Sequence, residues 1–193
     1  RPLHFQARSD YEVAFRGELD ANQIICFQDW VVHECCKQAH ERKWPHQVHV
    51  GTNNIAESGP LPLESLAKRY PDMNIVMIHC WPFLKEAAYL AKHIPNIYLD
   101  TCWMPVLNQE YLREALSMWL NYVPVHKMML SHDSTSVEMA TGSSLFTREI
   151  LAEVLLSQQR KLQVPDQRLR QFAADMLHNN AVRLYRIGEE FKI

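Results

Sequence analysis

The fold is decided by the stretch Asn74–Pro82, which reads NIVMIHCWP. Its four apolar residues from Ile75 to Ile78 run into a histidine without polar alternation. A short, continuous apolar run rich in β-branched residues is typical of a strand covered on both faces, as in a parallel sheet. Because His79 comes where the strand should end, we expect its side chain to point into the space that the loops enclose.

Three further apolar runs end in side chains that can hold a metal ion or a proton. They are Gln47–Gly51, Asn96–Asp100 and Lys127–Asp133. Apolar spacing predicts helices at Gln28–Lys43, Leu63–Tyr70, Phe83–His93, Asn108–Asn121, Leu145–Lys161, Asp166–Leu177 and His178–Tyr185. Strand, loop and helix therefore repeat at a spacing of roughly 25 to 30 residues, which is an α/β arrangement of βα units. Four units make half of an eight-fold barrel or most of an open doubly wound sheet.

Composition limits the class of protein. The 193 residues, 47% hydrophobic and 22% charged, suit a globular chain with one good-sized core. A net charge of −2 without a basic block argues against nucleic acid, and no apolar run approaches the ~20 residues of a membrane span. The five cysteines form no C-x-x-C pair, so we expect reduced thiols in a cytoplasmic protein.

The first part of the chain carries the weakest signals. Pro2–Gln6 could be the end of a strand, and Asp10–Leu19 a short helix or loop. The chain begins with Arg1 and shows no signal-peptide pattern, so we expect it to be a segment of a longer protein. The loops that should carry substrate specificity are 51–62, 101–108 and 134–144.

Four strand-end residues form the candidate site. In a βα-barrel, catalytic side chains project from the carboxyl ends of the strands, and His49, His79, Asp100 and Asp133 satisfy that rule. Imidazole and carboxylate ligands suit a divalent ion such as zinc at an open catalytic site, where the ion lowers the pKa of its water toward ~7. We expect Asp133 to be both a ligand and the base that takes the proton.

Other polar and aromatic residues near the strands need separate interpretations. His46 should face away from His49, because strand residues three apart point to opposite sides, and His132 should face the barrel wall. Asp100 could instead cap a loop. Trp81 and Trp103 could line a pocket or pack under the loops.

Several motifs resemble the amidohydrolase superfamily, in particular the amidohydrolase-related (amidohydrolase 2) branch that includes the domain fused to some glutamine synthetases. PHQVHVG at 45–51 resembles that branch's P-x-Q-x-H-x-G at the fifth strand. IHCWPF at 78–83, with KEAAYLA at 85–91, is similar to its sixth-strand histidine and "REAGYLA" helix. NIYLD at 96–100, LSHD at 130–133 and NAVRLY at 180–185 resemble its "NVYLD", "STD" and "NARRLY". The likeness covers about residues 27 to 187 in one order.

The resemblance implies a (β/α)8 TIM barrel of a metal-dependent hydrolase. Residues 1–193 would be the C-terminal part of this single domain, supplying about strands 4 or 5 to 8 and the C-terminal helices. By motif, His49 would bind the metal, His79 would bind it or polarise a substrate carbonyl, and Asp133 would be ligand and base. One zinc ion is implied, with manganese or iron as alternatives.

The family takes further ligands from an H-x-H on its first strand, and this sequence contains no H-x-H. We therefore expect the first strands to lie upstream; otherwise half a barrel must pair with another copy as a homo-oligomer. The function predicted is hydrolysis of a C–N or C–O bond in a small polar substrate. The alternatives are a decarboxylase or isomerase of the same superfamily, or a non-catalytic truncated barrel that acts as an interaction module.

Overall fold

The computed structural model describes residues 16–17, 20–52 and 54–188 of the chain. The strand end expected at Pro2–Gln6 lies outside these residues. The short helix or loop expected at Asp10–Leu19 lies outside them too, apart from residues 16 and 17, which form a turn.

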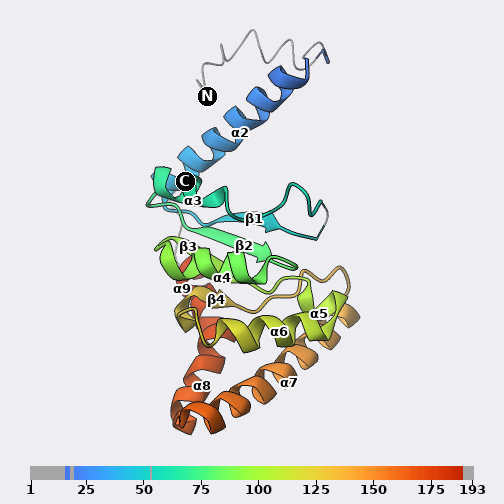
Figure 1. Ribbon diagram of the computed structural model, residues 1–193, viewed down its shortest axis with the longest axis vertical. Helices are drawn as coiled ribbons and strands as arrows, with labels where there is room; N and C mark the ends of the chain where they lie inside the picture. The colour runs from blue at the N-terminus through green and yellow to red at the C-terminus, as the bar shows by residue number, and fades with distance from the viewer. Residues whose placement is uncertain (1–15, 18–19, 53, 189–193) are drawn as a thin grey trace.

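The centre of the fold is a parallel sheet with its strands in sequential order β1-β2-β3-β4 (Figure 1). The strands are β1 (His46–Val50), β2 (Ile75–His79), β3 (Ile97–Asp100) and β4 (Met128–Met129). The predicted parallel α/β arrangement is confirmed. The last strand is shorter than expected because Val125–Lys127 forms a 3-10 helix, η1, immediately before it. Since all strands are parallel, their carboxyl ends meet at one edge of the sheet.

Helices connect and follow the strands. They are α2 (Ala21–Arg42), α3 (Leu63–Arg69), α4 (Leu84–His93), α5 (Met104–Leu107), α6 (Gln109–Trp119), α7 (Val137–Leu162), α8 (Asp166–Ala174), the π-helix η2 (Asp175–Asn179) and α9 (Asn180–Tyr185). The predicted helices before α7 are all present. The short α5 lies in a segment that was expected to be loop.

Two helices begin earlier than predicted, and capping explains both. The side chain of Asp20 accepts a hydrogen bond from Gln23 N at 2.9 Å, and the Gln23 side chain accepts one from Asp20 N, so this capping box starts α2. Ser136 Oγ accepts a bond from Met139 N at 3.2 Å and starts α7. The loop predicted at residues 134–144 is wrong from Val137 onward, because α7 runs through that part of it; the single glycine there costs a helix only about 1 kcal/mol.

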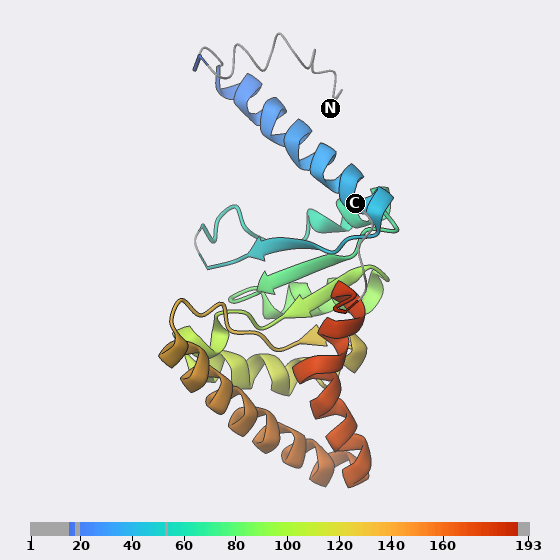
Figure 2. The ribbon, with the colours of Figure 1, turned by 180° about the vertical axis from the view of Figure 1, so that it is seen from behind.

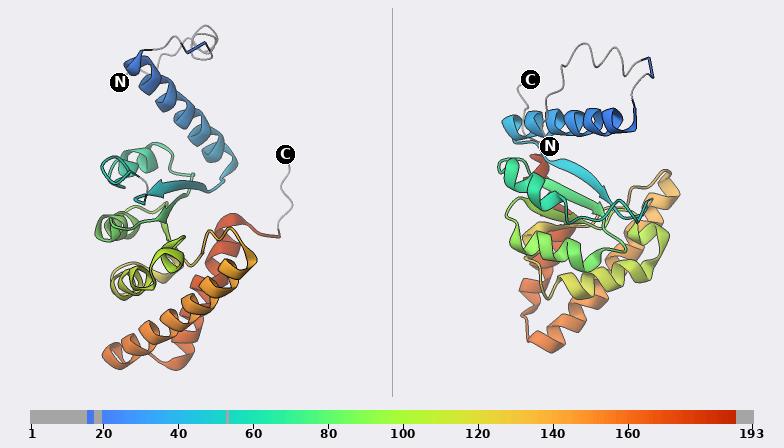
Figure 3. Two further views of the ribbon diagram at one scale, coloured as in Figure 1. Left: turned by 90° about the vertical axis from the view of Figure 1, so that its right-hand side faces the viewer. Right: turned by 45° about the horizontal axis from the view of Figure 1, so that its top comes forward.

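One face of the sheet is covered by α3, α4 and α6, as the left view of Figure 3 shows. The main core lies between these helices and the sheet. It includes Met77, Leu99, Leu90 and Trp119, each fully buried. The opposite face carries a smaller cluster, formed by Val76, Ile78, Cys102, Met129 and Leu184. Leu184 belongs to α9, which runs along this second face (Figure 2).

The two faces are not equally covered along every strand. All residues of β2 are buried, as predicted. In β1, Gln47 and His49 are exposed, which departs from the expected coverage on both faces. Within the described residues β1 is an edge strand, bonded to β2 alone, and its face that carries Gln47 and His49 is open.

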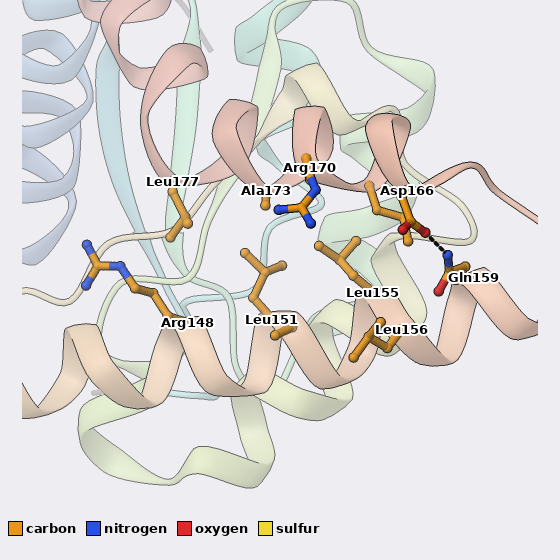
Figure 4. A pocket seen from close by; sticks show the side chains of 11 residues that line it. Arg148, Leu151, Leu155, Leu156, Gln159, Asp166, Arg170, Ala173 and Leu177 are labelled. Atoms are coloured by element: carbon orange, nitrogen blue, oxygen red, sulfur yellow. Dashed lines mark hydrogen bonds between the residues drawn. The ribbon is translucent and has the colours of Figure 1, made fainter.

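The helices at the two ends of the fold expose apolar surface. The long α2 projects from the body (Figure 1), and only Cys36 and Ala39 on it are buried. An apolar groove of about 450 Å³ lies between α7 and α8, with Leu151 and Leu155 on its floor (Figure 4). None of its described lining residues is a strand-end residue of the candidate site. No helix in the described part of the chain is long and apolar enough to cross a membrane.

Candidate metal centre

Two histidines meet at the carboxyl edge of the sheet. His49 of β1 and His79 of β2 approach with His49 Nδ1 3.0 Å from His79 Nε2. Their ring centroids are 4.7 Å apart. The sheet register explains the approach, because β1 and β2 pair Val50 with His79 and leave both rings at the strand ends. His49 is exposed, whereas His79 is 1% exposed.

The hydrogen bond of the other ring nitrogen of His79, Nδ1, determines which nitrogen of the ring carries the proton. His79 Nδ1 lies 3.1 Å from the carbonyl oxygen of Cys102, which can only accept a hydrogen bond. Burial lowers the pKa of His79, against the effect of the Cys102 carbonyl and with the nearby His49 ring acting in the same direction as burial, which favours the neutral ring. We therefore assign the proton to Nδ1, which leaves a lone pair on Nε2 facing His49.

Asp133 joins the histidines from the segment after β4. Ligand atoms of His79, Cys102 and Asp133 all lie within 4.8 Å of one another. Asp133 is exposed, and the other two residues are buried. His79 thus lies beside both other predicted metal-site residues, Asp133 in this group and His49 through the 3.0 Å contact, whereas His49 is not itself among the three residues whose ligand atoms lie within 4.8 Å of one another.

Asp100 lies beneath this group and holds the loop after β3. Its carboxylate accepts hydrogen bonds from Cys102 N at 2.8 Å and from Ser131 Oγ. Burial raises the pKa of Asp100 to about 6, against the effect of these hydrogen bonds. Of its two predicted roles, these contacts favour the loop cap.

Cys102 was not among the predicted site residues. It is 6% exposed, and burial raises the pKa of its thiol to about 12, with the Asp100 and Asp133 carboxylates adding to the rise. The strand pattern gives no signal for it, because β3 ends at Asp100 and Cys102 lies in a turn.

Unfavourable backbone conformations gather at the same edge. His79, Cys80, Trp103 and Asp133 all have positive φ, at 70°, 66°, 68° and 51°. Each such residue costs about 1–3 kcal/mol, and such residues occur preferentially at functional sites. The strain therefore marks this edge independently of its residue types.

The remaining predictions concern the surrounding residues. His46 is half-buried, whereas Gln47 and His49 are exposed. His46 therefore belongs to the face of β1 opposite His49, as expected. His132 Nε2 is buried with no hydrogen-bond partner in the part of the chain that the structure describes. The Trp81 ring stacks on Tyr111 at 4.2 Å, which is packing under the loops.

Trp103 differs from Trp81 because its ring centroid is 5.3 Å from that of His79. It therefore forms part of the wall of the site.

The donor set fits a divalent ion. Two nitrogen ligands at 2.0–2.1 Å from one tetrahedral ion stand about 3.3 Å apart, close to the 3.0 Å between His49 Nδ1 and His79 Nε2. Imidazole nitrogen, carboxylate oxygen and thiol sulfur are the donors that zinc and similar ions bind in proteins.

A family model described as "Amidohydrolase" matches residues 27–187. The chain belongs to the amidohydrolase family. Among curated proteins, this amidohydrolase is 29% identical over 175 residues to protein fluG of Emericella nidulans. That match covers 84% of the chain and 20% of fluG.

Solved structures agree on the fold. A proposed metal-dependent hydrolase of Lactobacillus casei matches with a TM-score of 0.73 and 19% identity, over 86% of this chain and 45% of that one. Uronate isomerase of Thermotoga maritima matches with a TM-score of 0.75 and 19% identity, over 93% and 45%. Uronate isomerase of Bacillus halodurans matches with a TM-score of 0.69 and 17% identity, over 87% of this chain and 43% of that one.

The amidohydrolase chain thus spans less than half of the structures it matches and one fifth of fluG. Its four parallel strands and covering helices correspond to part of a TIM barrel, as predicted. The candidate site lies at the carboxyl ends of the strands, where barrels of this type carry their active sites.

Proposed function

We propose that the protein is a metal-dependent hydrolase that cleaves a C–N or C–O bond in a small polar substrate. The observation that carries the proposal is the 3.0 Å approach of two strand-end imidazoles, His49 and His79, beside the Asp133 carboxylate. Membership of the amidohydrolase family supports it, since that family implies a divalent metal. Zinc is the ion proposed, with manganese and iron as alternatives.

His49, His79 and Asp133 would hold the ion. When bound, a divalent ion acts as a Lewis acid and lowers the pKa of a coordinated water toward ~7. His79 is suited to binding because it is buried and oriented by the Cys102 carbonyl. His49 and Asp133 are exposed and so face the space where a substrate enters.

Asp133 is proposed as the base. Its carboxylate oxygen would take a proton from the attacking water and pass it to the leaving group. The Trp103 ring beside His79 would exclude water on one side and give a flat apolar wall for the substrate.

The rest of the site is proposed to come from the other part of the barrel. Because the matches cover only 45% of each of two matched structures, we propose that residues 1–193 are the C-terminal part of one TIM-barrel domain. We propose a cytoplasmic location because all five cysteines, each within the described residues, are free thiols. A small molecule is the partner proposed, with no nucleic acid or membrane partner, and a homo-oligomer stays an alternative.

The test is metal content, measured by elemental mass spectrometry on the complete natural polypeptide. We expect about one zinc, manganese or iron per chain and loss of the metal in His49→Ala and Asp133→Ala. His46→Ala is the matched control, because His46 lies on the other face of the same strand. Retention of the metal in both site variants, or its absence after reconstitution of a folded protein, would overturn the proposal.

A substrate panel then separates the reaction types. Amides and lactones report hydrolysis, carboxylated rings report decarboxylation, and uronates report isomerisation. Turnover of uronates alone would replace the hydrolase by the isomerase alternative. A folded protein that binds metal but turns over none of these would favour the non-catalytic module.

A further inference from the structure

We propose that Cys102 is a thiolate ligand of the same metal ion, which makes the centre selective for zinc. The inference rests on the proposed function and deepens it, because it chooses among the three metals left open there. It comes from the contacts of one loop, residues 100–103, with the two strands beside it.

The backbone of Cys102 is fixed on both sides. Its N–H donates to the buried Asp100 carboxylate at 2.8 Å, and its carbonyl accepts from His79 Nδ1 at 3.1 Å. Asp100 in turn accepts a hydrogen bond from Ser131 Oγ, which ties the loop to the segment after β4. A backbone held in this way fixes the direction of the Cα–Cβ bond of Cys102.

That direction is toward the candidate ligands. The sulfur of Cys102, a ring nitrogen of His79 and a carboxylate oxygen of Asp133 lie within 4.8 Å of one another. A nitrogen and a sulfur ligand at a tetrahedral angle stand about 3.6 Å apart, given bonds of 2.3 Å to sulfur and 2.0–2.1 Å to nitrogen. Small side-chain rotations therefore bring the three atoms onto one ion, which with His49 and the reacting water would have five ligands, a number that catalytic zinc sites also reach.

A second cysteine, Cys80, shows that being next to His79 in the sequence does not place a thiol at the site. Cys80 directly follows His79, but its thiol donates to Met77 O at 3.3 Å and packs in the main core under the helices. Cys102 instead belongs to the smaller cluster on the second face of the sheet. Only Cys102, of the two, can reach His79 and Asp133 together.

A sulfur ligand changes which metal the centre prefers. Thiolates favour zinc and similar borderline or soft ions, whereas sites of nitrogen and oxygen alone also suit manganese and iron. On binding, the S–H bond is replaced by a metal–sulfur bond and the proton leaves to solvent. We therefore expect zinc and cobalt to be taken up in preference to manganese.

The experiment is cobalt substitution of the complete natural polypeptide. Wild type should show visible ligand-field bands together with a near-ultraviolet thiolate-to-cobalt charge-transfer band. Cys102→Ser should lose the charge-transfer band and bind zinc more than about tenfold more weakly. Cys36→Ala, which removes a buried cysteine from α2, should keep the charge-transfer band and the zinc affinity of wild type.

The outcomes separate this inference from the function it rests on. Ligand-field bands without the charge-transfer band in wild type, or a charge-transfer band that survives in Cys102→Ser, would overturn the thiolate ligand and leave the metal centre standing. No cobalt or zinc uptake at all would overturn both. Should Cys102→Ser fail to fold, X-ray absorption of zinc-loaded wild type decides, because a sulfur neighbour at about 2.3 Å is required and nitrogen or oxygen neighbours alone contradict it.

Discussion

Gly51, at the end of β1, lies directly against the backbone carbonyl of Trp81 beyond β2. A Cβ atom on Gly51 would stand 1.9 Å from Trp81 O, and the glycine has a φ of +75°. The next residue, Thr52, donates its N–H to the same carbonyl at 3.2 Å. The close approach holds the loops after β1 and β2 together and so keeps His49 beside His79.

Gly51→Ala should therefore destabilise the fold and separate the two histidines. We expect a loss of at least about 2 kcal/mol in the free energy of unfolding, because overlap adds to the cost of the positive φ. Gly142→Ala is the control, since a Cβ there meets nothing within 4 Å and α7 gains about 0.5–1 kcal/mol. Urea titration measures both, and equal stability of the two variants would contradict the packing at Gly51.

Lys127→Met should destabilise the protein although the substitution adds apolar character. Lys127 is 7% exposed, and its ammonium donates to the carbonyls of Ala91, Ile94 and Ile97 at 2.9, 2.6 and 3.2 Å. Methionine leaves these carbonyls without their donor, at a cost of about 2–4 kcal/mol. Lys85→Met on the exposed side of α4 should change the free energy of unfolding by less than about 0.5 kcal/mol in the same titration.

Much of the fold was predictable because its strands carry a local pattern. The apolar runs ending in His79 and Asp100 identify buried parallel strands without reference to the rest of the chain. The errors arose where a cap competed with a helix-breaking residue. Gly142 suggested a loop, but the cap at Ser136 starts α7 before it and packing carries the helix through.

The candidate site was predictable only in part, for a similar reason. His49, His79 and Asp133 follow from the rule that active-site residues stand at strand ends. The place of Cys102 depends on hydrogen bonds to His79 and to Asp100, and Asp100 is itself bonded to Ser131, 31 residues away. Such contacts between separate loops leave no periodic signal in a single sequence.

Asn96→Asp should be among the more damaging single-atom changes in the chain. The side-chain amide of Asn96, 8% exposed, donates to the carbonyls of Ala67, Tyr70 and Met73 at 3.1, 3.1 and 2.8 Å. A carboxylate would replace this donor with an acceptor that faces three carbonyl oxygens, and it would bury a charge, at a cost of about 3 kcal/mol or more.

Asn121→Asp makes the same chemical change at an exposed site and is the matched control. Thermal unfolding of the two variants provides the comparison. A melting temperature of Asn96→Asp equal to that of Asn121→Asp would contradict the bonding described at Asn96.

His46 should make the stability of the protein depend on pH. Burial lowers the pKa of His46 below its ordinary value of 6.5. Below pH 6.5 the unfolded chain therefore binds a proton that the folded chain does not, so stability is present above that pH and falls as the pH falls. His46→Gln should reduce the loss of unfolding free energy between pH 7 and pH 5, measured against wild type by urea titration. An unchanged pH slope would contradict a buried neutral ring.

Zinc should stabilise the folded protein, and Asp133 should be needed for this effect. A ligand bound only by the folded state adds about 2.7 kcal/mol at 100 times its Kd. We expect that gain in the free energy of unfolding for wild type and for His46→Gln, with removal by a chelator, and little of it for Asp133→Asn. Asp133 is exposed, so the substitution itself costs little stability without zinc. An equal gain in Asp133→Asn would mean that zinc binds somewhere other than the edge of the sheet where Asp133 meets His79 and Cys102.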